Sequence, residues 1–87
     1  MIPVYGFLAG DTLGILLLLE EDDNAREIVA KLQRSSRLRV SPRADLCVVH
    51  AGVVIDPGAR LADTPIESLD RVDVVPRDSV GERSASR

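Results

Sequence analysis

Two apolar segments open the chain, separated by turn-forming residues. Residues 2–9 are apolar and partly β-branched, and residues 14–20 form a second apolar run. The intervening Gly10-Asp11-Thr12 has the composition of a turn. Pro3 has no N–H to donate to a neighbouring strand, which suits the start of a strand or an edge strand. The pattern predicts a β-hairpin made of these two segments.

The third segment has the period of an amphipathic helix. Within residues 24–34, apolar side chains recur at offsets of three, four and seven positions, which places them on one helical face. These side chains are Ala25, Ile28, Val29 and Leu32. The acidic run 20–23 before the helix is predicted to be a solvated loop. Asp22 or Asp23 is expected to cap the helix, because acids suit its positive N-terminal end.

Three short strands and one short helical segment follow. Strands are predicted at residues 46–50, 53–55 and 71–75, each an apolar run next to turn residues. Thr64-Pro65 has the sequence of a helix N-cap followed by proline at the first helical position. The order strand, strand, helix, strand, strand, short helix, strand predicts an α+β fold. Its class is the β-grasp, or ubiquitin-like, arrangement with one main helix on a mixed five-stranded sheet.

Length and composition fit one small domain. The chain has 87 residues, of which 45% are hydrophobic and 2% aromatic, so we expect a single aliphatic core. Residues 1–76 are predicted to form the ubiquitin-like domain. Residues 77–87 contain one aliphatic side chain of any size, Val80, and are predicted to be a flexible C-terminal tail.

Few residues are able to carry chemistry. The chain has one cysteine, Cys47, and one histidine, His50, which excludes an intramolecular disulfide, a four-cysteine site and a two-histidine metal motif. Cys47 is expected to act as a small buried hydrophobe, and His50 to lie at the surface or in an interface. No acid–base pair, nucleophile constellation or phosphate-binding loop is recognisable. We therefore predict no catalytic residue, metal or cofactor on this chain.

Charge and hydropathy narrow the class of partner. The net charge of -3 argues against non-specific binding to nucleic acid. The longest apolar run, residues 15–19, is far shorter than the roughly 20 residues that cross a membrane. The first five residues lack the basic segment of a signal peptide. We expect a cytoplasmic protein that binds neither nucleic acid nor membranes.

The predicted strands are apolar on both of their faces. A sheet covered by one helix should alternate apolar and polar residues, yet residues 15–19 and 46–49 are continuously apolar. Either the strand ends curl into the core, or a partner chain buries the outer face of the sheet. Arginines after the helix are placed to pair with acids on such a partner. The candidate contact residues are Leu17, Val48, Arg37, Arg39 and Arg43.

Several segments, taken in order, resemble one protein family. They are Ile2-Pro3-Val4, residues 15–19, Ala25-Arg26-Glu27-Ile28-Val29-Ala30-Lys31, Arg39-Val40-Ser41-Pro42, Leu46-Cys47-Val48-Val49-His50 and Leu69-Asp70-Arg71-Val72-Asp73-Val74-Val75. Over residues 2–75 the chain resembles the gamma subunit, or B protein, of the hydroxylase in soluble di-iron multicomponent monooxygenases. The nearest branch contains the toluene, alkene and isoprene monooxygenases.

This resemblance implies both a fold and a role. Members of the family are ubiquitin-like and lie on the outside of a hydroxylase built from paired α, β and γ chains, an α2β2γ2 assembly. The di-iron centre belongs to the large α chain. The reaction is an O2- and NADH-dependent hydroxylation or epoxidation of small hydrocarbons, with electrons from a reductase and a ferredoxin. The resemblance assigns no catalytic residue to this chain. It implies that the chain is a non-catalytic structural subunit.

Two other classes of function remain open. A free-standing ubiquitin-like adaptor would bind unrelated proteins and carry a polar outer sheet face. A conjugation or sulfur carrier would need a C-terminal diglycine, whereas the last glycine here is the single Gly81. The chain differs from the family pattern in its short connection between the third and fourth strands and in its longer tail. These differences leave the substrate undecided.

Overall fold

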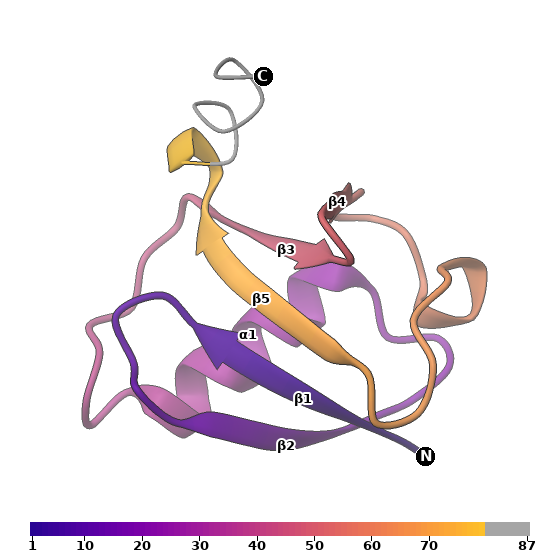
Figure 1. The fold of residues 1–87 in the computed structure, drawn as a ribbon, viewed down its shortest axis with the longest axis horizontal. Helices are drawn as coiled ribbons and strands as arrows, with labels where there is room; N and C mark the ends of the chain where they lie inside the picture. Colours follow the sequence, from indigo (N-terminus) through magenta and orange to yellow (C-terminus); the bar gives the residue numbers. More distant parts are fainter. Residues whose placement is uncertain (80–87) are drawn as a thin grey trace.

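One helix packs across one face of a mixed five-stranded sheet in the computed structural model, which describes residues 1–79 (Figure 1). The elements in chain order are β1 (Ile2–Leu8), β2 (Gly14–Leu19), α1 (Ala25–Ser36), β3 (Leu46–His50), β4 (Val53–Ile55), the 3-10 helix η1 (Leu61–Asp63) and β5 (Arg71–Pro76). The predicted ubiquitin-like α+β class is confirmed. Residues 77–79 have helical backbone, and the remainder of the predicted tail lies outside the described residues.

The sheet brings together strands that are distant in sequence. Its order is β2-β1-β5-β3-β4, with the first and last strands of the chain paired in parallel at the centre. The other three pairings are antiparallel. The connection between β3 and β4 is the two-residue turn Ala51-Gly52, whose φ angles of 51° and 81° match a type I′ hairpin turn.

The core lies between α1 and the inner face of the sheet. Ala25, Ile28 and Leu32 are the buried apolar residues of the helix, as its spacing predicts. A Cβ atom at Gly6 would lie 3.2 Å from the Leu32 and Leu17 methyl groups, so this glycine lets the helix approach β1 closely. Full burial of one such aliphatic side chain stabilises the fold by roughly 1.5–3 kcal/mol.

The start of α1 differs from the prediction. Asn24 is the N-cap, and its Oδ1 accepts a hydrogen bond from the Glu27 amide at 3.1 Å. Asp23 is buried, and its Oδ2 accepts from the Glu20 amide at 2.9 Å and from Lys31 Nζ at 2.8 Å. The Glu20 amide and then Lys31 lower the pKa of this carboxyl. The prediction of a solvated loop is therefore wrong at Asp23, which fastens the end of β2 to the helix.

The short helical segment begins earlier than predicted. It covers Leu61–Asp63, and Thr64 ends it rather than starting a helix. The Thr64 hydroxyl donates to the Leu61 carbonyl at 2.8 Å. Pro65 disfavours helical backbone at the preceding residue, and Thr64 is accordingly extended with ψ of 163°. Leu69, with φ of 67°, then turns the chain into β5.

Candidate partner interface

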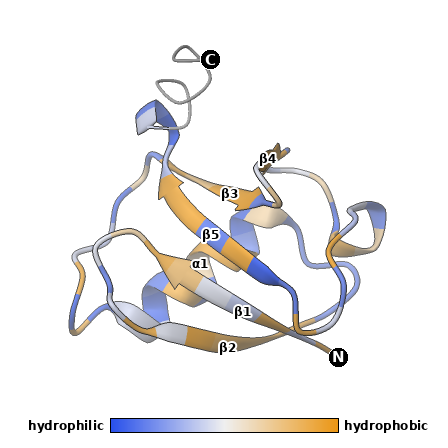
Figure 2. Cartoon of the chain, viewed as in Figure 1, coloured by the Kyte–Doolittle hydropathy of each residue, from blue (hydrophilic) through white to orange (hydrophobic). Residues whose placement is uncertain are grey.

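The face of the sheet opposite α1, here called the open face, carries exposed apolar side chains on β1 and β2. Leu16 is 50% exposed and Leu18 is 54% exposed. Tyr5, directly opposite Leu16 in the β1–β2 register, is also exposed. Figure 2 views the sheet from this side, with the helix behind it and apolar colouring along the strands. Because the three side chains are cross-strand or same-strand neighbours on one face, they form a continuous apolar surface.

A third leucine, Leu69, lies beside this surface in a constrained turn. The Leu69 amide donates to the Pro3 carbonyl at 2.6 Å, and Pro3 is the cross-strand partner of Leu18. Leu69 is exposed and has a positive φ, a conformation that a bulky side chain rarely adopts. We call Tyr5, Leu16, Leu18 and Leu69 the open patch.

Leu17 and Val48, the candidate contacts chosen from the strands, lie on the opposite face. Leu17 is only 5% exposed, Val48 is buried, and both belong to the core cluster beneath α1. Since side chains alternate along a strand, a shift of one position moves a residue from one face to the other. In β2 the outward leucines are therefore Leu16 and Leu18, and neither Leu17 nor Val48 faces outward.

The middle of the open face is packed by an aromatic side chain. Phe7 lies opposite Gly14, where an added Cβ atom would come within 2.5 Å of the Phe7 Cζ atom. The Arg71 guanidinium lies 4.1 Å from the centroid of the ring and forms an ion pair with Asp73 at 2.9 Å. The ring thus covers the glycine, and the neighbouring charges compensate each other.

The β3 half of the open face is less exposed than the continuous apolar run predicts. Cys47 and Val49 alternate with the inward Val48, yet both are buried. The expectation that Cys47 is a small buried hydrophobe is confirmed. The outward apolar residues of β3 are therefore buried within the chain itself, whereas β2 has exposed leucines.

Two of the three candidate arginines already have partners within the chain. Arg39 binds Asp11 through Nε at 3.0 Å and through Nη2 at 3.0 Å, and this hydrogen bonding lowers the pKa of Asp11 to about 2. Arg43 pairs with Asp45 at 2.7 Å and lowers the pKa of that carboxyl. Arg37 is exposed and forms no ion pair with a carboxylate of residues 1–79. It precedes Leu38, which is 94% exposed and stands apart from the open patch in sequence.

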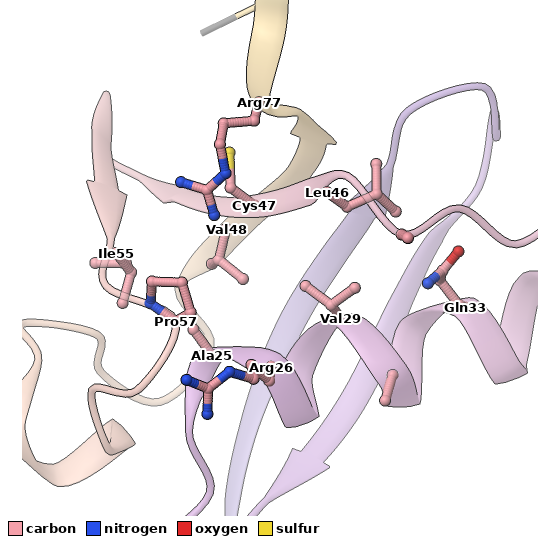
Figure 3. Close-up of a pocket in the computed structure, with 12 residues that line it drawn as sticks. Ala25, Arg26, Val29, Gln33, Leu46, Cys47, Val48, Ile55, Pro57 and Arg77 are labelled. Atoms are coloured by element: carbon pink, nitrogen blue, oxygen red, sulfur yellow. The ribbon is translucent and has the colours of Figure 1, made fainter.

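A groove of about 420 Å³ separates α1 from β3 (Figure 3). Val29 projects from the helix, Leu46 and Val48 belong to β3, and Ile55 and Pro57 close one side. Figure 3 also shows two cationic side chains at this groove, which we call the α1–β3 groove. Arg26 comes from the first turn of α1, and Arg77 extends back from the end of β5.

The remaining candidates for chemistry are tied into the fold. His50 Nε2 lies 2.9 Å from Asp70 Oδ2, and the same oxygen accepts from the Glu67 amide at 2.9 Å. The Glu67 amide, followed by His50, lowers the pKa of Asp70. Within residues 1–79 no three histidine, cysteine or carboxylate side chains gather as metal ligands would, so the donors of this part of the chain do not fit a di-iron centre. None of the helices described in residues 1–79 has the length and hydropathy needed to cross a membrane.

Comparison with solved structures defines the class of the fold. The chain superimposes on a ubiquitin from Caldiarchaeum subterraneum with a TM-score of 0.73 at 12% identity, covering 87% of this chain and 92% of that one. A chain from a structure described as "Molecular Mimicry of SUMO promotes DNA repair" gives a TM-score of 0.72 at 18% identity, with 85% and 89% covered. The fold is therefore ubiquitin-like.

The family follows from the sequence. Residues 1–75 match the model of the family "Toluene-4-monooxygenase system protein B (TmoB)". The chain belongs to this family, which confirms the resemblance seen in its sequence. A chain from a structure described as "Toluene 4 monooxygenase HD Complex with Inhibitor 4-Bromobenzoate" has a TM-score of 0.81 at 20% identity, covering 87% of this chain and 98% of that one. A comparison with curated protein sequences gave no significant match.

Proposed function

We propose that this chain is a non-catalytic structural subunit of the hydroxylase of a di-iron hydrocarbon monooxygenase. Membership of the TmoB family over residues 1–75 is the observation that carries the proposal. The similar fold of a chain from a toluene 4-monooxygenase complex supports it. In this role the chain binds the large (α) and medium (β) hydroxylase subunits in an α2β2γ2 assembly.

The open patch is the surface that we propose for packing on the large subunit. Leu16 and Leu18 each leave about half of their surface in water, and Tyr5 and Leu69 extend this surface. Removing apolar surface from water contributes roughly 25 cal/mol per Å². A partner that covers the patch therefore gains favourable free energy, and the ion-paired Arg71 and Asp73 beside it add no unbalanced charge to the interface.

The chemistry in this proposal belongs to the partner. In this proposal the di-iron centre lies in the large subunit, as membership of the TmoB family implies. Substrate oxidation would then depend on this chain only through the stability and shape of the hydroxylase. Which hydrocarbon is oxidised is decided by residues of the partner.

A free-standing ubiquitin-like adaptor is the second candidate function. The likeness of the fold to a ubiquitin and to a chain from a SUMO-mimicry structure favours it. The adaptor predicts a monomer that exchanges between unrelated partners. The exposed leucines of the open patch favour a stable assembly instead, because an apolar surface left in water promotes aggregation.

Purification of the tagged chain from its native host tests the proposed function. The expected result is co-purification of two larger chains, with about two irons per large subunit as a carboxylate-bridged di-iron centre requires. Mass spectrometry identifies the chains, and elemental analysis measures the iron. Recovery of an iron-free monomer would contradict the proposal and leave the adaptor as the better account.

A further inference from the structure

The α1–β3 groove has an apolar floor, and hydrogen bonds fix one of its ends. Val48 and Ile55 are buried along it, and Val29 contributes from the helix. At one end, the Gln33 side chain holds the loop before β3 by two hydrogen bonds with the Arg43 backbone, at 3.0 and 2.7 Å. These contacts fix the position of the loop relative to α1 at this end of the groove.

The two arginines at this groove differ from most other arginines of the fold. Arg39, Arg43, Arg60 and Arg71 are each paired with an aspartate. Arg26 and Arg77 are exposed and form no ion pair with a carboxylate among residues 1–79. The groove therefore combines an apolar interior with positive charge at its mouth, on a chain whose formal net charge is -3.

The wall formed by β3 offers backbone groups as well as side chains. The short β4 pairs only with Val48, Val49 and His50 of this strand. Leu46 and Cys47 pair with β5 on one side and have no strand on the other side among residues 1–79. Two residues after the end of β4, Pro57 has no N–H group with which to extend the hydrogen bonding between β4 and β3. A free strand edge beside an apolar groove favours an extended segment, which adds main-chain hydrogen bonds to side-chain contacts.

We infer that the α1–β3 groove binds an extended segment of a hydroxylase subunit, with an apolar side chain inserted between α1 and β3 and an adjacent carboxylate bound by Arg26 and Arg77. The inference rests on the proposed function, because it takes the occupant from the hydroxylase. It assigns this chain a second contact, separate from the open patch. The carboxylate complements the two guanidinium groups, which have no carboxylate partner among residues 1–79. A guanidinium binds a carboxylate in a planar, bidentate geometry.

A photo-crosslink identifies the occupant directly. Ala30 is exposed on α1 and lines the groove, so p-benzoylphenylalanine at this position reaches its interior. The same residue at Arg34, an exposed position on the helix outside the groove lining, is the matched control. After irradiation of the assembled hydroxylase, we expect position 30 to crosslink to a subunit segment with an apolar residue within about two positions of Asp, Glu or a C-terminal carboxylate. A crosslink to a second copy of this chain, or none above the control, would overturn the inference.

Substitutions measure how much the groove contributes to assembly. Ala30→Trp fills the groove, and Arg26→Glu reverses a charge at its mouth. Arg34→Glu makes the same charge change on the same helix and serves as the control. We expect each groove variant to weaken binding of the purified hydroxylase subunits at least tenfold, and Arg34→Glu to change it less than twofold. Unfolding midpoints of all three variants show whether each remains folded.

The outcomes separate this inference from the proposed function. If the wild-type chain binds the hydroxylase and folded groove variants bind as tightly as Arg34→Glu, the inference is wrong and the proposed function stands. If the wild-type chain binds no hydroxylase subunit, both are wrong. Loss of binding in the groove variants alone supports the groove as a contact.

Discussion

The two faces of β2 carry the same residue type and have different surroundings. Leu17 and Leu19 face α1 and are buried, with Leu17 only 5% exposed. Leu16 and Leu18 face away from the helix and are 50% and 54% exposed. One strand of leucines therefore supplies both part of the core and part of the open patch. The comparison teaches that the side of the sheet, rather than the residue type, decides whether a leucine is buried in the core or remains exposed.

The open face itself is divided in the same way. On β2 its leucines are exposed, whereas on β3 the outward Cys47 and Val49 are buried. Phe7, stacked between Gly14 and Arg71, lies in the middle. Exposed apolar side chains thus lie at the β1–β2 edge of the sheet and also on β4, where Val53 is 62% and Val54 37% exposed. The α1–β3 groove lies toward the β4 edge.

The largest expected difference between the two faces of β2 is in stability. Leu17→Ala should lower the free energy of unfolding by about 2–5 kcal/mol, because it leaves a cavity in the core. Leu16→Ala should change it by no more than about 0.5 kcal/mol, since this side chain is half in water. Urea unfolding of the isolated variants measures both values. Equal losses for the two variants would remove the distinction between the faces.

A smaller effect is expected where the Phe7 ring packs on Gly14, at the start of β2. Gly14→Ala should cost about 1–3 kcal/mol, because the new methyl group would meet the Phe7 ring and displace it from Arg71. The same substitution in a Phe7→Leu background should cost less, since the ring is absent. A double-mutant cycle measured by urea unfolding gives the coupling. Independent effects of the two substitutions would mean that the ring does not pack on this glycine.

The smallest effect concerns how the free energy of unfolding falls at acidic pH, through Asp11 in the turn between β1 and β2. Hydrogen bonds from Arg39 lower the pKa of Asp11 from 3.8 to about 2 in the folded chain. Because the folded pKa is depressed, the stabilisation is present above about pH 4 and is lost as the pH falls through about 2. Asp11→Asn should therefore show a shallower loss of stability than wild type between these values. Urea midpoints at pH 7, 4 and 2.5 measure it, and parallel curves would contradict the assignment.

Much of the fold could be predicted because local signals agree along the chain. The helical spacing of Ala25, Ile28 and Leu32 identified α1, and its buried face is the one predicted. The predicted strands at residues 46–50 and 53–55 have the bounds of β3 and β4. The errors arose where side-chain hydrogen bonds decide the conformation. Asn24 rather than an aspartate caps the helix, and Thr64 ends a 3-10 turn.

The interface could be predicted only in outline. An unbroken run of leucines shows that both faces of β2 are apolar, but period-2 alternation alone does not say which leucines face the helix. Leu17 and Val48 were therefore chosen in place of residues such as Leu16. The groove gave no sequence signal, because Arg26 and Arg77 are 51 positions apart and line the same groove only in the folded chain. The pairing of Arg39 with Asp11 likewise depends on tertiary structure.

Binding of the purified hydroxylase subunits to the Leu16→Asp/Leu18→Asp variant tests the proposed packing by the open patch most directly. Leu38→Asp is the matched control, since Leu38 is an equally apolar side chain that is 94% exposed next to Arg37. Loss of an interface hot spot costs about 2 kcal/mol or more, so the double variant should raise the Kd at least about 30-fold. The control should change the Kd less than about twofold. A wild-type Kd for the double variant, or a larger loss for Leu38→Asp, would contradict docking through the open patch.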